Sequence, residues 1–308
     1  MGTRRPPSAT GSRDAEAAAA ARVMGAPRDP EELDAAGAPV HAALPTGTRM
    51  GPVHLKVADL ARSLDYYGAA IGLEVLARWD GGASLGAAGV ELLVLAEEPG
   101  ARPAAGHTGL YHFALLVPER AGLAAWLAHA ARDRVPLTGV ADHFVSEALY
   151  LSDPDGHGIE IDWDRPRERW EGQVAARMTT LSLDVDDLMH ELDDPAGEPF
   201  DRLPDGTVMG HVHLKVADVP AAVVCYRDAL GFGLMAQLGG QAAFMAAGGY
   251  HHHSTAVPNT NASTTATPTG PARQPERGAG GHTEDLADRA VGWAVQRGRH
   301  GDVGKRSP

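Results

Sequence analysis

The stretch Met50-Gly-Pro-Val-His-Leu-Lys-Val-Ala-Asp59 recurs almost unchanged as Met209-Gly-His-Val-His-Leu-Lys-Val-Ala-Asp218. Nine of the ten residues are identical, at an offset of 159 positions, and the similarity extends to Gly72 and its counterpart Gly231. Each copy alternates apolar and polar residues, which is typical of a β-strand, and leads into a helical pattern that the glycine ends. The chain therefore contains a repeated strand–helix unit.

Working outward from the first copy, the pattern predicts two successive units of order β-α-β-β-β. The first has strands at 53–57, 75–79, 83–85 and 90–95 with a helix at 60–71, and the second has strands at 111–116, 138–140, 148–151 and 158–163 with a helix at 120–134. A third unit begins with the second copy of the repeat, but its strand periodicity fails after Tyr250. We expect an α+β fold of paired βαβββ modules forming a curved mixed sheet, with an incomplete second domain.

Composition divides the chain into five segments. We expect a disordered leader (1–48), a first domain of two modules (49–170), a linker with one helix near 185–192 (171–206), a partial second domain of one module (207–253) and a low-complexity, disordered tail (254–308).

The charge balance limits the partners that the chain can have. With 40 acidic and 27 basic residues, the formal net charge of −13 argues against nucleic-acid binding. We find no apolar run of the roughly 18 residues that a membrane-spanning helix needs, so we expect no membrane partner. A single cysteine, Cys225, cannot form an intramolecular disulfide, and we expect a cytoplasmic protein.

Three side chains that can bind a metal lie on predicted strands, each between apolar neighbours. His54 lies between Val53 and Leu55, and His112 and Glu160 are flanked in the same way. Because alternate strand residues face opposite sides, all three could point to the concave face of one curved sheet. Two imidazoles and a carboxylate on one face of a divalent metal suit non-haem Fe(II).

The segment from His143 to Glu160 adds two further polar groups. Within it, Asp153-Pro-Asp-Gly156 predicts a tight turn between two antiparallel strands, so Tyr150 and Glu160 should face the same site from one hairpin. His143 should lie at the mouth of the same pocket, where an imidazole can exchange a proton near neutral pH.

This segment resembles the signature of extradiol ring-cleavage dioxygenases. The wider chain, through Asp164-Arg-Pro166 and Gly249-Tyr-His-His-His253, looks like the catechol-2,3-dioxygenase-type proteins of the vicinal-oxygen-chelate (glyoxalase) superfamily. The resemblance implies ferrous iron or sometimes manganese, O₂ as cosubstrate and a small aromatic diol as substrate. It makes His54, His112 and Glu160 the metal ligands, His143 an acid/base group and Tyr150 a hydrogen-bond donor to the substrate.

Several alternatives stay open. His213 holds in the repeat the position of His54 and could replace it as third ligand; we favour His54, because adjacent modules normally pack together. We interpret His251–His253 as a structural motif, since neighbouring strand residues point to opposite faces.

The same scaffold could also serve a glyoxalase-like isomerase, a fosfomycin-resistance-type thiol transferase or an inactive protein that binds a small aromatic ligand. The uncovered strand edges of an incomplete domain lead us to expect either a homodimer or poor solubility of the full chain.

Overall fold

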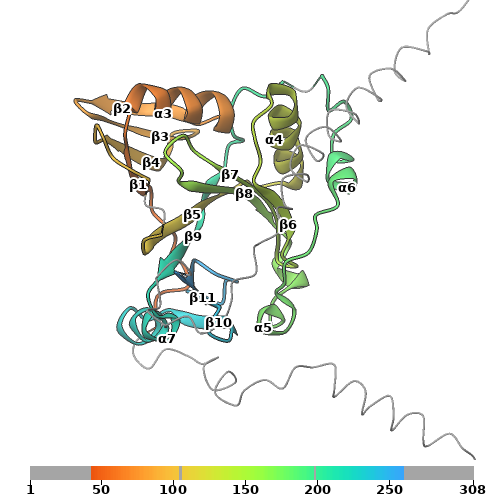
Figure 1. Ribbon diagram of the computed structural model, residues 1–308. Coiled ribbons are helices and arrows are strands. Elements are labelled where there is room, and N and C mark those ends of the chain that lie inside the picture. Colours follow the sequence, from red (N-terminus) through yellow and green to blue (C-terminus); the bar gives the residue numbers. More distant parts are fainter. Residues whose placement is uncertain (1–42, 104–105, 198, 260–308) are drawn as a thin grey trace, which may run out of the picture.

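The computed structural model describes residues 43–103, 106–197 and 199–259 (Figure 1). Most of the predicted leader and almost all of the predicted tail lie outside these ranges. Within them, none of the helices is long and apolar enough to cross a membrane.

The first module follows the predicted order of elements. It consists of β1 (Val53–Val57), α3 (Leu60–Tyr66) continued by a π-helical turn (Tyr67–Ile71), β2 (Glu74–Trp79), β3 (Gly82–Ala87) and β4 (Val90–Glu97). Asp59 caps α3 by accepting a hydrogen bond from the backbone N–H of Arg62, and Gly72 ends the helical segment with φ +86°. The four strands form a sheet of their own in the order β1-β4-β3-β2.

The second and third modules share one larger sheet. The second contributes β5 (Gly109–Leu116), α4 (Arg120–Asp133), β6 (Gly139–Asp142), β7 (Ser146–Ser152) and β8 (Gly158–Asp164). The third contributes β9 (Val208–Val216), α7 (Val219–Val223) with a π-helical turn (Val224–Ala229), β10 (Gly233–Leu238), β11 (Ala242–Ala246) and β12 (Ser254–Pro258). The strand order is β10-β11-β12-β9-β5-β8-β7-β6, and β5 runs antiparallel to β9.

The expected α+β fold, with paired βαβββ modules forming a curved mixed sheet, is confirmed, but the first two modules do not form that sheet together. The second module pairs edge to edge with the third, through β5 and β9, and the first module packs against the second through a shared core. That core joins Leu55 and Tyr67 of the first module to Phe113 and Trp126 of the second. Burial of these apolar side chains holds the modules together without a shared strand edge. Figure 1 shows α3 and α4 at one end of the molecule and α7 at the other.

The third module extends further than predicted. Strand β12 begins at Ser254, one residue after the expected end of the module, and pairs with β9 in parallel and with β11 in antiparallel orientation. Ser254, Thr255 and Ala256 are all buried. Their small and β-branched side chains fit a strand that is covered on both faces. Such a strand need not alternate apolar and polar residues, so the sequence pattern did not predict it.

The predicted linker contains two short helices. The helix expected near 185–192 is α6 (Val185–Met189), whereas α5 (Val174–Arg177) was not predicted. The segment between them, including Thr179 and Thr180, passes the edge of the main sheet and contributes to the cavity described below.

Candidate metal centre and active site

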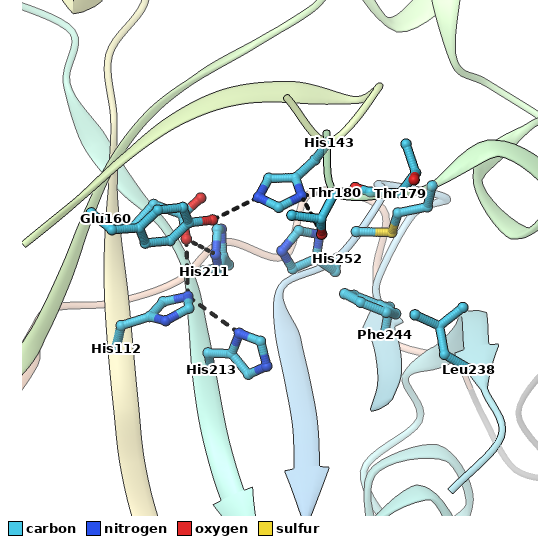
Figure 2. A pocket seen from close by; sticks show the side chains of 12 residues that line it. His112, His143, Glu160, Thr179, Thr180, His211, His213, Leu238, Phe244 and His252 are labelled. Atoms are coloured by element: carbon cyan, nitrogen blue, oxygen red, sulfur yellow. Dashed lines mark hydrogen bonds and ion pairs between the residues drawn. The ribbon is translucent and has the colours of Figure 1, made fainter. Parts of the chain in front are cut away.

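Three side chains from neighbouring strands of the main sheet converge on one point. His112 lies on β5, Glu160 on β8 and His211 on β9. The Nε2 atoms of His112 and His211 lie 2.9 Å and 3.2 Å from Oε2 of Glu160, and all three potential ligand atoms lie within 4.8 Å of one another (Figure 2). All three residues are buried. Such a set of two imidazoles and one carboxylate can bind a divalent metal and leave positions open.

His54 does not belong to this cluster. Strand β1 lies in the four-stranded sheet, and the His54 side chain is exposed. The alternative ligand His213 lies closer, with its Nδ1 3.3 Å from Nε2 of His112, but it contacts His112 rather than Glu160. The third member is instead His211, two residues earlier on the same face of β9. We did not single it out from the sequence, although it is the only mismatch between the two ten-residue copies, where His211 replaces Pro52.

The charges in the cluster favour a cation between the three groups. Burial alone would raise the pKa of Glu160, but the adjacent His211 and His112 imidazoles hold it well below its usual value. Burial lowers the pKa of His211. An ionised carboxylate beside an imidazole that stays neutral is the protonation state that binds a metal.

His143 and Tyr150 lie side by side next to the cluster. His143 Nδ1 is 2.9 Å from the carbonyl oxygen of Thr179, and His143 Nε2 is 2.7 Å from the Tyr150 hydroxyl. A carbonyl only accepts, so Nδ1–H of His143 donates to Thr179, and in the neutral form of His143 the unprotonated Nε2 then accepts from the Tyr150 hydroxyl. Burial and the nearby Glu160 carboxylate raise the pKa of Tyr150, so its hydroxyl remains a donor.

A cavity of about 340 Å³ opens over these groups. It is lined by His112, His143, Tyr150, Glu160, Met178, Thr179, Thr180, His211, His213, Leu238, Phe244 and His252. A second cavity, of about 480 Å³, shares the walls formed by His112, His143 and Tyr150. Among the described residues, neither lining includes a lysine or an arginine.

Comparison with known proteins places this arrangement in a family. A family model described as the Glyoxalase/Bleomycin resistance protein/Dioxygenase superfamily matches residues 49–161 and 208–298. The chain belongs to this superfamily. It is 44% identical over 212 residues to the catechol-2,3-dioxygenase of Bacillus subtilis (strain 168), an alignment that covers 67% of this chain and 73% of the relative.

Solved structures were also matched. A putative dioxygenase from Bacillus subtilis subsp. subtilis str. 168 aligns with a TM-score of 0.46 and 16% identity, over 68% of this chain and 63% of that protein. A glyoxalase/dioxygenase from Nostoc punctiforme aligns with a TM-score of 0.34 and 19% identity, over 41% of this chain and 99% of that protein.

The residues fit the divalent metal that membership of this superfamily implies. Behind His211, Nδ1 lies 3.8 Å from Oδ2 of Asp162, and neither Nδ1 nor the Asp162 oxygens have a hydrogen-bond partner among the described residues. When a metal takes Nε2 of a histidine, Nδ1 carries the proton and commonly donates it to a carboxylate. Asp162 stands where such a carboxylate is needed.

A further residue of the cavity wall, His252, was not predicted to act in the site. It lies within the His251–His253 run, and its ring stands 4.2 Å from that of His211, centre to centre. Figure 2 shows it on the cavity wall between the metal-ligand cluster and Thr179. Only His252 of the three lines this cavity. The three histidines lie in the loop before β12 rather than in a strand, so the strand alternation expected from the sequence does not describe them, and this loop brings one of the three to the cavity.

Proposed function

We propose that this protein is an Fe(II)-dependent extradiol dioxygenase that opens a catechol-like ring with O₂. The observation that carries the proposal is the buried set His112, Glu160 and His211 beside the hydrogen-bonded pair His143 and Tyr150. The name of the Bacillus subtilis relative supports the same reaction. Manganese is the alternative metal, and O₂ is the cosubstrate.

In this proposal His112, His211 and Glu160 hold the metal. When bound, the metal supplies Lewis acidity, which lowers the pKa of a coordinated hydroxyl, and brings the diol and O₂ together. The ligand residues come from three adjacent strands, so the sheet fixes their relative positions. The carboxylate balances part of the metal charge, and the imidazoles provide neutral donors.

His143 and Tyr150 act on the substrate from the same side. His143 Nε2 already accepts a hydrogen bond from Tyr150, so it can accept a proton from a diol hydroxyl that takes the place of the phenol. Tyr150, whose pKa is raised, stays protonated and donates a hydrogen bond to a substrate oxygen. Proton transfer by a positioned side chain of this kind contributes roughly 10²- to 10⁴-fold in rate.

The opposite wall of the cavity suits a flat aromatic ring. Met178, Leu238 and Phe244 line it and offer apolar contact to one end of a ligand whose polar end faces the histidines. A glyoxalase-like isomerase or a thiol transferase could use the same metal ligands. The small aromatic diol is favoured because the pair His143 and Tyr150 matches the two adjacent hydroxyls of a catechol.

The test is anaerobic purification with metal analysis, followed by catechol and air. We expect about one iron per chain, O₂ uptake and a yellow ring-cleavage product, with the product lost in His112→Ala. Bound metal without O₂ uptake would overturn the dioxygenase proposal in favour of the isomerase or transferase. A protein that binds no metal would overturn the metal centre itself.

A further inference from the structure

Two segments that the proposed mechanism does not use lie against each other. The end of β8 brings Asp164 to the loop that precedes β12, where its Oδ2 accepts a 2.5 Å hydrogen bond from the Tyr250 hydroxyl and its Oδ1 lies 2.9 Å from Nε2 of His251. Arg167 reinforces the contact by donating to the carbonyl oxygens of Gly248 and Gly249. The same carboxylate therefore binds both residues that precede His252.

The chain of hydrogen bonds continues into the cavity wall. Nδ1 of His251 lies 2.8 Å from Nδ1 of His252, and His252 lines the cavity beside the metal-ligand cluster. Asp164 thus connects to the cavity through His251, although it is not among the residues that line that cavity.

The chemistry of each atom sets the direction of these bonds. A carboxylate accepts, so Nε2–H of His251 donates to Asp164, and a neutral His251 then has a lone pair at Nδ1. The adjacent Nδ1 of His252 must therefore carry a proton and donate it to His251. A neutral His252 is left with an unprotonated Nε2.

The packing around the two rings holds this arrangement in place. His251 is fully buried, and its ring lies 4.0 Å from that of Tyr250 and 5.2 Å from that of Trp170, centre to centre. Trp170 is fixed in turn by the 2.8 Å hydrogen bond from its Nε1 to the carbonyl oxygen of Arg165. The His252 ring packs in turn against the rings of His211 and Phe244, so rotation of either imidazole would break these contacts, and the hydrogen-bond direction set at Asp164 determines the protonated nitrogen of His252.

We propose that Asp164 is a positioning residue, which acts through His251 to fix the tautomer of His252 so that its Nε2 lone pair accepts a hydrogen bond from a ligand hydroxyl in the cavity. The identity of that hydroxyl, one of a diol, rests on the proposed function. The tautomer itself does not. In this arrangement the acceptor His252 and the donor Tyr150 line the same cavity, and the two together orient a molecule with adjacent hydroxyls.

The direct test is the tautomer of His252 in the full-length chain. The protein is labelled with ¹⁵N in its histidine rings and loaded with diamagnetic Zn²⁺, and the His252 signals are assigned by their loss in His252→Gln. We expect Nδ1 of His252 to be protonated and Nε2 to be unprotonated. A proton on Nε2 in the wild-type protein would overturn the proposal, whether or not any variant folds.

Two variants separate positioning from a general effect on folding. Asp164→Ala removes the carboxylate that accepts the hydrogen bond from His251, and we expect His252 to lose its single tautomer. Tyr250→Phe removes the other hydrogen bond to the same carboxylate but leaves the hydrogen bonds from Asp164 through His251 to His252 intact. We therefore expect the His252 tautomer of the wild-type protein. An unchanged pattern in a folded Asp164→Ala variant would overturn the role of Asp164.

Turnover of catechol by the iron-loaded variants gives a second readout. We expect Asp164→Ala to lower kcat/KM for catechol at least ~10-fold, because without a fixed acceptor at His252 the diol is held and oriented less well, and Tyr250→Phe to leave kcat/KM near wild type. An unchanged kcat/KM in Asp164→Ala would overturn the proposal. Absence of O₂ uptake by the wild-type enzyme would instead overturn the proposed function, and the tautomer measurement in the Zn²⁺ protein would stand independently.

Discussion

His211 and His54 occupy chemically similar strands but very different surroundings. The side chain of His211 is buried against Glu160 and Asp162, two carboxylates on the neighbouring part of the sheet. His54 faces solvent on β1, within a different sheet. A histidine contributes to metal binding only where other ligands converge on the same point, so the two residues should respond in opposite ways to substitution.

We expect His211→Ala to weaken binding of Mn²⁺ by more than about 100-fold, because even loss of a residue that supports a ligand costs 10- to 100-fold. His54→Ala should leave the affinity unchanged and serves as the matched control. Titration calorimetry on the apo-protein measures both. Loss of affinity in His54→Ala, with retention in His211→Ala, would restore the ligand set predicted from the sequence.

The sequence could predict the types of residue at the site better than their partners. His112, Glu160, His143 and Tyr150 lie within one module, and local patterns define the β7–β8 hairpin that places Tyr150 opposite Glu160. His211 comes from another module, and the identical letters around His54 and His213 do not show which strand edges meet. The informative signal was the one difference between the copies, Pro52 and His211, because a proline at that point cannot bind a metal.

At the scale of elements, the turn between β7 and β8 links the main sheet to the first module. Oδ1 of Asp153 accepts from the backbone N–H groups of Asp155 and His157, and Oδ2 lies 2.9 Å from both the Tyr67 hydroxyl and Nδ1 of His157. Because Tyr67 belongs to the first module, this one carboxylate ties together the hairpin that carries Tyr150 and Glu160 and the helical segment packed against it.

We expect Asp153→Asn to lower the free energy of unfolding by about 2 kcal/mol, since it disrupts buried, charge-assisted hydrogen bonds. Burial opposes ionisation of Asp153, but His157 and the other donors lower its pKa below the ordinary value of 3.8, so its contribution is present above that pH and is lost as the pH falls through the lowered value. The hydrogen bond to Asp153 raises the pKa of His157 above 6.5, so that contribution is full below 6.5 and is lost as the pH rises through the raised value.

The destabilisation should therefore be largest between about pH 4 and pH 6.5 and should shrink in more acidic solution. Urea unfolding of both proteins at pH 5.5 and at pH 3 measures it. An equal difference at the two pH values would show that the ionised pair has no part in the linkage.

The elements themselves were predictable where periodicity is local. The helical segment 60–71 with its end at Gly72 was expected from a single stretch of chain, and the structure has α3 and its π-helical turn over these residues. Strand β12 was missed because its residues are buried on a strand with neighbours on both sides, where apolar and polar residues need not alternate. The pairing of β5 with β9 was missed because it depends on which edges remain free after each module has folded.

At the scale of the whole molecule, the three modules have separate tasks. Every residue that lines the cavity over the metal-ligand cluster comes from the second module, the third module or the segment 178–180 between them. The first module supplies none, and its apolar side chains instead complete the shared core beneath the sheet. The active site therefore depends on the antiparallel pairing of β5 and β9, which brings two modules of one chain around a single cavity.

The charge of the molecule and of its cavity predicts which diols are accepted. The chain carries a formal net charge of −13, and no lysine or arginine is among the described residues that line the two cavities. A carboxylate on the ring would be transferred from water to a site with no cation to pair with, which is costly. We expect kcat/KM for 3,4-dihydroxybenzoate to be at least about 100-fold below that for 4-methylcatechol, a difference of about 2.7 kcal/mol.

Leu238, about half exposed at the rim, offers a gain-of-function test. Leu238→Arg should reduce the difference in kcat/KM between the two diols by pairing with the carboxylate, and the uncharged control Leu238→Gln should not. Similar kcat/KM values for the two diols in the wild-type enzyme would mean that the substituent stays in solvent rather than entering either cavity.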